Sequence, residues 1–141
     1  MISINRKFER RMVLVASSWQ VISGVITSFI YAPTISNNST YLEELSEFDV
    51  VSAQILLKNV YIVSFTIGLF FIVFGFVNFF ISTRMKDDQI DKKISVWFLI
   101  YSVICFFMMD IFSMIIFFVT AIIMFSKNKV IKQKYKQQLL K

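Results

Sequence analysis

Apolar residues along this chain gather into three long blocks that short charged segments separate. Residues 12 to 32 and 59 to 82 carry no charged side chain, and residues 94 to 125 carry one, Asp110. A helix on the surface of a soluble domain has polar residues at every turn, whereas about 20 consecutive apolar residues cross a bilayer. The pattern therefore predicts an all-α integral membrane protein.

The third block is too long for one crossing. A single helix over residues 94 to 125 would extend roughly 48 Å, against a hydrocarbon core of about 30 Å. A break at Asp110 yields two helices of roughly 24 Å and 22 Å, which flanking lysines can anchor. We therefore expect a tight, outward-facing helical hairpin with Asp110 at its tip.

Cationic residues mark alternate sides of these blocks. The segment before the first block carries Arg6, Lys7, Arg10 and Arg11, and Lys58 is the only cation between the first two blocks. The connector after the second block and the C-terminal tail are basic again. Because cytoplasmic segments are enriched in Lys and Arg, both termini and the connector are expected in the cytoplasm, which requires four crossings.

These arguments predict a four-helix bundle that forms a single transmembrane domain in the cell (plasma) membrane. The outer segment contains the capping-box spacing Thr40-x-x-Glu43, which predicts a short amphipathic helix from about Tyr41. We expect crossings at about residues 12–32, 55–82, 94–109 and 111–126, an outer segment at 33–54, an inner connector at 83–93 and a basic cytoplasmic tail at 127–141.

Small and polar residues recur at three- and four-residue steps in the first two crossings. Small residues let helix backbones approach and polar ones bond across helices, so the two stripes are expected to pack as a seam. The alternative is a hydrated path or small-ligand pocket lined by Gln20, Asn78 and Tyr31. The seam residues are Ser17, Gln20, Gly24 and Thr27 in the first crossing and Ser64, Gly68, Gly75 and Asn78 in the second.

Two roles are open for Asp110. As a turn residue it caps the helix that follows, where the helix dipole favours an anion. As an intramembrane carboxylate it binds a proton or a cation, which is the usual hypothesis for an acid at membrane depth.

Two charged segments suit contacts outside the bundle. The outer acids form either a partner contact or one side of a linker helix; they are Glu43, Glu44, Glu47 and Asp49. The tail is expected to extend the last helix along anionic lipid. Its lipid-surface residues are Lys127, Lys129, Lys132, Lys134 and Lys136. No groove-reading motif accompanies these lysines, so nucleic acid is not an expected partner.

The composition removes most catalytic chemistry. The chain has 141 residues, of which 57% are hydrophobic, with one cysteine and no histidine. Disulfide frameworks, Cys/His zinc sites and histidine bases are thus impossible within one chain. Cys105, Met108 and Met109 recur at i, i+3 and i+4 and suit Cu(I), but Met commonly fills apolar helices. We expect no enzyme activity, no metal and no cofactor.

The layout resembles small four-helix membrane proteins of unknown function from Gram-positive bacteria. The stretches that carry the resemblance are "RRMVLVASSWQVISGVI", "IGLFFIVFGFVNFFISTRMK" and "FFVTAIIMFSKNK". The signatures of other small four-helix classes do not occur: the first block has no Glu of a multidrug exporter, and there are no paired cysteines of a quinone-linked disulfide enzyme.

The sequence favours a protein that works by association: an accessory subunit of a larger transport or cell-envelope complex, or a homo-oligomer. Its partners are then the lipid bilayer and other membrane subunits. One alternative is self-immunity to a membrane-active peptide, with the outer acids attracting a cationic peptide. A further alternative, which rests on Asp110 and the polar stripes, is a small transporter or holin-like pore.

Overall fold

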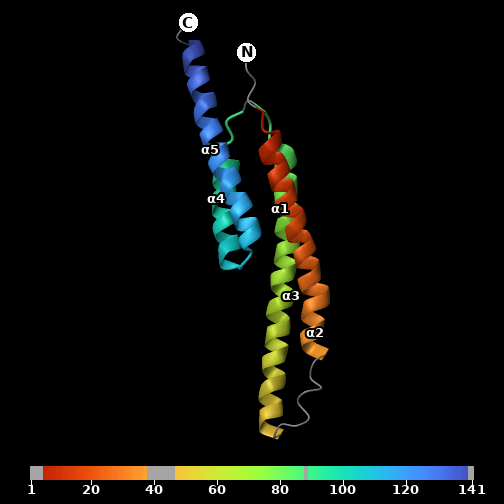
Figure 1. Ribbon diagram of the computed structural model, residues 1–141. Helices are drawn as coiled ribbons and strands as arrows, with labels where there is room; N and C mark the ends of the chain where they lie inside the picture. The colour runs from red at the N-terminus through yellow and green to blue at the C-terminus, as the bar shows by residue number, and fades with distance from the viewer. Residues whose placement is uncertain (1–4, 38–46, 88, 140–141) are drawn as a thin grey trace. The chain divides into compact units, whose positions relative to one another are not determined.

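The computed structural model describes residues 5–37, 47–87 and 89–139, and all regular secondary structure in these ranges is helical. The predicted all-α class is thereby confirmed for the described residues. The short outer helix expected from about Tyr41, with Glu43 and Glu44, lies outside these ranges. The helices are α1 (Lys7–Ile26), which continues through the π-helical turn η1 (Thr27–Tyr31) into α2 (Ala32–Asn37), then α3 (Glu47–Arg84), α4 (Lys92–Phe107) and α5 (Ile111–Leu139) (Figure 1).

Among the described residues, three helices are long and apolar enough to cross a membrane, which agrees with the predicted membrane character. They cover Lys7–Ile35, Val51–Arg84 and Ile111–Leu139. The fourth, α4, has 16 residues. At about 1.5 Å per residue it extends roughly 24 Å, which is less than the hydrocarbon core of about 30 Å.

The first helix continues through Pro33, although the first crossing is expected to end at Ala32. Proline lacks an N–H donor, and its ring presses on the carbonyl four residues earlier, here that of Phe29. The turn just before Pro33 is π-helical, and the Ala32 N–H donates to the carbonyl of Thr27, five residues back. This wider turn accommodates the proline, so the helix reaches Asn37 instead of stopping.

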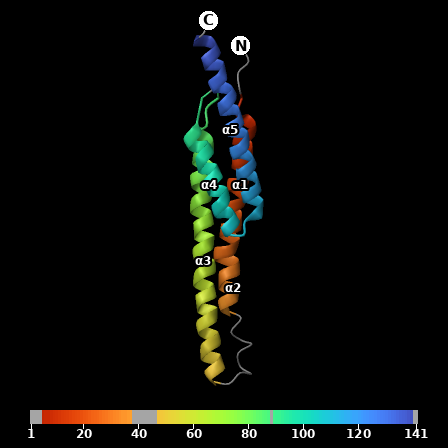
Figure 2. The same cartoon turned by 90° about the vertical axis from the view of Figure 1, so that its left-hand side faces the viewer.

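The described chain forms two compact units. The terminal unit comprises Met1–Trp19 and Gly75–Lys141, and the middle unit comprises Gln20–Phe74. In the terminal unit α4 and α5 lie side by side as a helical hairpin (Figures 1 and 2). Phe117 on α5 packs against two rings of α4, with centroid distances of 5.6 Å to Phe98 and 5.0 Å to Tyr101.

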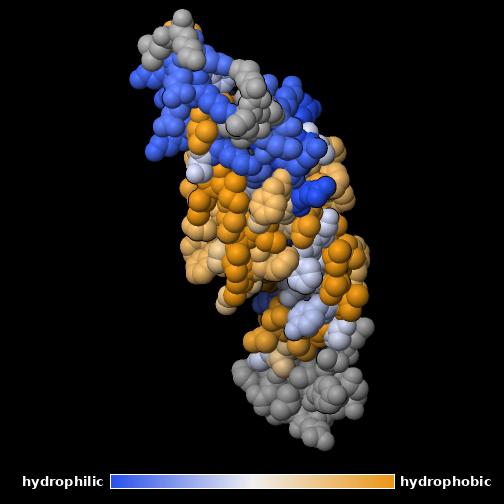
Figure 3. All heavy atoms as spheres, turned by 45° about the horizontal axis from the view of Figure 1, so that its top comes forward, coloured by the Kyte–Doolittle hydropathy of each residue, from blue (hydrophilic) through white to orange (hydrophobic). Residues whose placement is uncertain are grey.

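Inside the terminal unit the interior contains many small and polar side chains, while large apolar ones face outward. Figure 3 shows hydrophobic residues over a broad surface next to a strongly hydrophilic end. Such an outward face is unfavourable in water and suits contact with lipid, where small residues allow close helix packing. Buried polar residues include Ser17, Asn78, Ser82, Ser95, Ser102, Ser113 and Thr120, and exposed apolar ones include Phe76, Phe80, Ile100, Phe106 and Phe107.

Candidate functional site

Arg6, just before α1, is fully buried, which is rare for arginine without partners. Its guanidinium donates hydrogen bonds to the carbonyl oxygen of Gln89 and to Oδ1 of Asn128. Its backbone N–H donates to Oδ1 of Asp87 at 2.8 Å, and a carboxylate oxygen of Asp91 lies 3.9 Å from the guanidinium. Arg6 therefore joins the N-terminal segment to the connector and to α5.

Asn128 on α5 uses both ends of its amide. Oδ1 accepts from Arg6, and Nδ2 donates to Oγ of Ser95 at 3.1 Å. The Ser95 hydroxyl in turn donates to the carbonyl oxygen of Asp91 at 2.9 Å. With donor and acceptor both engaged, the amide has one orientation, and it connects α5 to the first turn of α4.

Glu9 on α1 is also fully buried and faces Lys127 on α5. The Lys127 Nζ lies 2.7 Å from Glu9 Oε1 and donates to the carbonyl oxygen of Asn5 at 2.7 Å. By distance the Lys127–Glu9 contact is a close ion pair. Its angles are not those of a directed hydrogen bond, since neither Glu9 oxygen has a hydrogen-bond partner. Charge attraction therefore holds this pair.

Arg10, one turn further along α1, contacts the end of α3 and the connector. Its guanidinium donates to the carbonyl oxygen of Met85 at 2.7 Å and lies 4.0 Å from Asp87 Oδ1. The Ser82 hydroxyl returns a hydrogen bond to the carbonyl oxygen of Arg10 at 3.0 Å. These contacts fix the start of α1 against the last turn of α3.

Together these side chains form what we call the ionic network. Its charges balance, because three cations face three carboxylates, and it joins α1, the connector, α4 and α5 at one end of the terminal unit. A cluster with balanced charges of this kind holds the segments that it joins in contact. In the described part of the chain, no group of three or more His, Cys, Asp or Glu side chains could hold a metal. The members are Arg6, Glu9, Arg10, Asp87, Asp91, Ser95, Lys127 and Asn128.

Sequence reasoning missed this network because it assigned the cations to topology alone. One signal was present: Arg6, Glu9 and Arg10 occupy i, i+3 and i+4, which places them on one helical face. A second was the occurrence of Asp87 and Asp91 in an otherwise basic connector. Neither signal indicates Asn128 as the partner.

The helical run breaks at the predicted place. Met109 adopts a left-handed conformation with φ of 59°, and its N–H donates to the Phe106 carbonyl at 3.1 Å. The Asp110 N–H donates to the Cys105 carbonyl at 3.0 Å, which completes a Schellman motif at the end of α4. Asp110 Oδ1 then accepts from the Ser113 N–H at 3.1 Å and caps α5.

The same turn separates the sulfur-bearing residues whose spacing suits Cu(I) in a continuous helix. The spacing of Cys105, Met108 and Met109 puts them on one face only if the helix continues, and α4 ends at Phe107. Cys105 is buried, whereas Met109 is 84% exposed. The three sulfur atoms therefore do not share a helical face.

In the middle unit, the predicted seam residues Gly24 and Gly68 lie against each other. A Cβ on Gly68 would lie 2.8 Å from the Gly24 carbonyl oxygen and 2.2 Å from Oγ of Ser28. The Ser28 hydroxyl donates to the Phe65 carbonyl at 3.4 Å. The backbones of the first helix and α3 thus touch at this crossing, and Ser28, which sequence reasoning missed, is part of it.

The other seam residues are distributed unevenly. Ser17, Gln20, Gly75 and Asn78 are buried, while Thr27 and Ser64 are only partly buried. Ser28 holds the inward position expected for Thr27, whose hydroxyl donates within its own helix to the Ser23 carbonyl at 2.8 Å. Tyr31, a lining residue of the alternative path or pocket, is 62% exposed.

The structure describes part of the outer acidic segment and most of the basic tail. Glu47 and Asp49 lie in the first turn of α3. The basic tail is helical, because α5 continues to Leu139. Lys127 is bound in the ionic network, while the outward-facing tail lysines are Lys129, Lys132 and Lys136.

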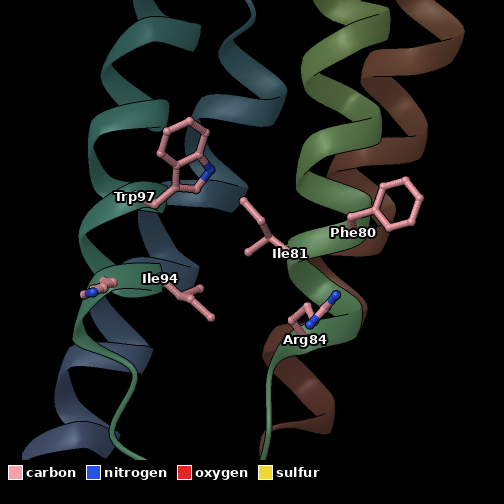
Figure 4. A pocket seen from close by; sticks show the side chains of 6 residues that line it. Phe80, Ile81, Arg84, Ile94 and Trp97 are labelled. Carbon is pink, nitrogen blue, oxygen red and sulfur yellow. The ribbon is translucent and has the colours of Figure 1, made fainter.

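An open groove of about 370 Å³ lies in the terminal unit between the end of α3 and the start of α4 (Figure 4). Ile81 from α3 and Ile94 from α4 point toward each other across it, with Trp97 beside them. Trp97 Nε1 donates to Oδ1 of Asn78 at 3.0 Å. The lining residues are Phe80, Ile81, Arg84, Lys93, Ile94 and Trp97.

No family model matches the chain, and neither a curated protein nor a solved structure matches it. The resemblance to small four-helix membrane proteins therefore stays a prediction.

Proposed function

We propose that this chain acts by association in a membrane, as an accessory subunit of a larger transport or cell-envelope complex, with no catalytic step of its own. The observation that carries the proposal is how its buried charges are used. Arg6 and Glu9 belong to the ionic network, and Asp110 caps α5. Catalytic and transport sites instead direct polar groups toward a substrate.

The outward surface of the terminal unit supports the same proposal. Large apolar side chains cover α4 and the first turns of α5, where Phe107 and Ile111 are 77% and 59% exposed. Such a surface suits lipid and the helices of a partner equally well. A pore has less support, because the Asp110 carboxylate serves a helix cap. Self-immunity to a peptide remains the alternative, and it rests on the outer acids.

Purification in a mild detergent tests this function. We expect the tagged chain to retain a second membrane protein, or another copy of itself, at a defined ratio. The complex should survive a Lys136→Gln change, which alters an exposed tail lysine outside the ionic network. A strictly monomeric chain that retains no protein would count against association. An adjacent gene for a bacteriocin precursor would favour the immunity alternative.

The proposal includes the orientation of the chain, with both termini in the cytoplasm of a cell with a single plasma membrane. Support comes from the basic segments before α1, between α3 and α4, and at the end of α5. The ionic network adds to it, because it joins three of these segments to one another. The α4–α5 hairpin then begins and ends on the cytoplasmic side.

The lengths of two helical segments indicate how far this hairpin extends into the bilayer. Near its tip, the Phe112 ring lies 5.1 Å from that of Trp19. Trp19 is eight residues beyond Arg11, which is about 12 Å, and Phe112 is fifteen residues before Lys127, which is about 22 Å. Both lengths are less than the hydrocarbon core of about 30 Å. We therefore favour a hairpin that turns within the bilayer.

Thiol labelling tests orientation and depth together. In a background with Cys105→Ser, cysteines at Gln89 and Gln137 should react with an impermeant reagent only after permeabilisation, and a cysteine at Asn37 should react in intact cells. A cysteine at Asp110 should stay unlabelled from both sides. Labelling of Asp110 from outside would show that the hairpin crosses fully, and labelling of Gln137 from outside would refute the orientation.

A further inference from the structure

The groove between α3 and α4 combines apolar walls with two cations at one end. Its walls are Phe80, Ile81, Ile94 and Trp97, and its cations are Arg84 and Lys93. Arg84 is the last residue of α3, and Lys93 is the second residue of α4. Both cations therefore stand where an apolar run meets the charged connector, which is the level of lipid headgroups. The walls belong to the apolar runs themselves.

In the described part of the chain, no carboxylate pairs with the cations of the groove. The ionic network pairs the connector acids Asp87 and Asp91 with Arg6 and Arg10. Within the ranges that the structure describes, neither Arg84 nor Lys93 forms an ion pair with a carboxylate. Two cations beside an apolar groove complement a molecule with an anionic head and an apolar chain.

Trp97, which lines the groove, is held in place by contacts with Asn78 and Tyr101 outside the groove lining. The hydrogen bond from Trp97 to Asn78 at 3.0 Å joins α4 to α3, and the Trp97 ring stacks on Tyr101 at a centroid distance of 6.2 Å. A fixed indole beside an aliphatic surface offers a preformed path for an acyl chain, so little ordering is needed on binding.

We infer that this groove binds one anionic phospholipid of the cytoplasmic leaflet. Its phosphodiester receives charge-assisted hydrogen bonds from the Arg84 guanidinium and the Lys93 ammonium, and one acyl chain lies along Ile81, Ile94 and Trp97. Because two cations meet one phosphate, a headgroup without its own cation, such as phosphatidylglycerol, is preferred to phosphatidylcholine. This inference requires the membrane location and does not depend on which partner the chain has.

Trp97 supplies the readout. The chain has two tryptophans, so Trp19→Phe leaves the groove tryptophan as the only indole. The full-length protein is reconstituted in phosphatidylcholine nanodiscs that contain a small fraction of phosphatidylglycerol with brominated acyl chains. We expect the brominated phosphatidylglycerol to quench Trp97 fluorescence much more strongly than its mole fraction in the bilayer would by random contact. Brominated phosphatidylcholine at the same fraction should quench only in proportion.

Matched charge variants locate the site. Arg84→Gln with Lys93→Gln should lower the apparent affinity for phosphatidylglycerol about thirtyfold, from two lipid-facing cations. The control pair, Lys86→Gln with Lys92→Gln, removes the same charge from exposed lysines outside the groove lining. It should change the apparent affinity for phosphatidylglycerol less than threefold, which is roughly the effect of distant, screened charges. Ile81→Phe keeps the charge, narrows the groove and should also weaken quenching.

Each contrary result is decisive. Equal losses in the two charge pairs would reduce the effect to general surface attraction and overturn the site. Displacement of the lipid by inorganic phosphate would show a free-anion site. A change in the mass of the purified oligomer in the Arg84→Gln, Lys93→Gln pair, with quenching unchanged, would assign the groove to a second copy of the chain.

Discussion

Arg6→Met is expected to destabilise the folded protein by about 3–5 kcal/mol, the range for removing one partner from a buried charge cluster. Methionine matches the length of the arginine stem and supplies no donor. The Asn128 Oδ1 atom and the Gln89 carbonyl would each lose a donor, and Asp91 would lose the cation 3.9 Å from its carboxylate. The free energy of unfolding is to be measured from loss of helical signal in an SDS titration of mixed micelles.

Lys7→Met is the matched control, since it removes the same charge from the next residue, whose side chain is exposed. It should change stability by less than about 0.5 kcal/mol, as most surface substitutions do. Adding Asn128→Leu to Arg6→Met should cost less than the sum of the two single changes, because both ends of one hydrogen bond are then removed. Equal unfolding of Arg6→Met and Lys7→Met would mean that the network contributes little.

Gly68→Ala is expected to force the first helix and α3 apart and to destabilise the protein by about 1–3 kcal/mol or more, as overpacking does. The new Cβ would lie 2.2 Å from Oγ of Ser28, 2.8 Å from the Gly24 carbonyl oxygen and 2.9 Å from the Ser28 backbone nitrogen. The hydroxyl can rotate away. The backbone atoms can move only if the helices separate.

Two companion variants make this expectation specific. Thr66→Ala, two residues away on an exposed face, should leave the unfolding midpoint nearly unchanged. Gly68→Ala with Ser28→Gly should recover only part of the loss, because the contacts with the backbone of Gly24 and Ser28 remain. Full recovery would show that the hydroxyl alone sets the spacing. Equal stability of Gly68→Ala and Thr66→Ala would contradict the close crossing.

The hairpin shows how far sequence reasoning reaches locally. A 32-residue run is too long for a crossing, and its one acid and the lysines on both sides of the run indicate a break at Asp110. The way the break is made does not follow. A left-handed residue at a helix end is usually glycine, and here it is Met109, whose exposed side chain accepts that conformation beside a capping Asp110.

At Pro33 and in the basic tail, the structure differs from what the sequence led us to expect. The first crossing was expected to end at about Ala32, and the π-helical turn before Pro33 removes the conflict with the proline ring that would have ended the helix. The tail was expected to lie on lipid through all five lysines, yet Lys127 turns inward to Glu9. The first difference arises from the local geometry of the helix, and the second arises from a residue on another helix that the linear sequence does not reveal.

By itself the sequence determined the class of the protein, its helical blocks and the position of the hairpin, because transfer to lipid depends on the hydropathy of consecutive residues. Only the tertiary structure decided that Arg6 and Asn128, 122 positions apart, bond each other, that Ser28 meets Gly68, and that the cations Arg84 and Lys93 border one apolar groove. These outcomes depend on the register and rotation with which helices pack. Register and rotation are set by the fit of whole faces, which no single stretch of sequence contains.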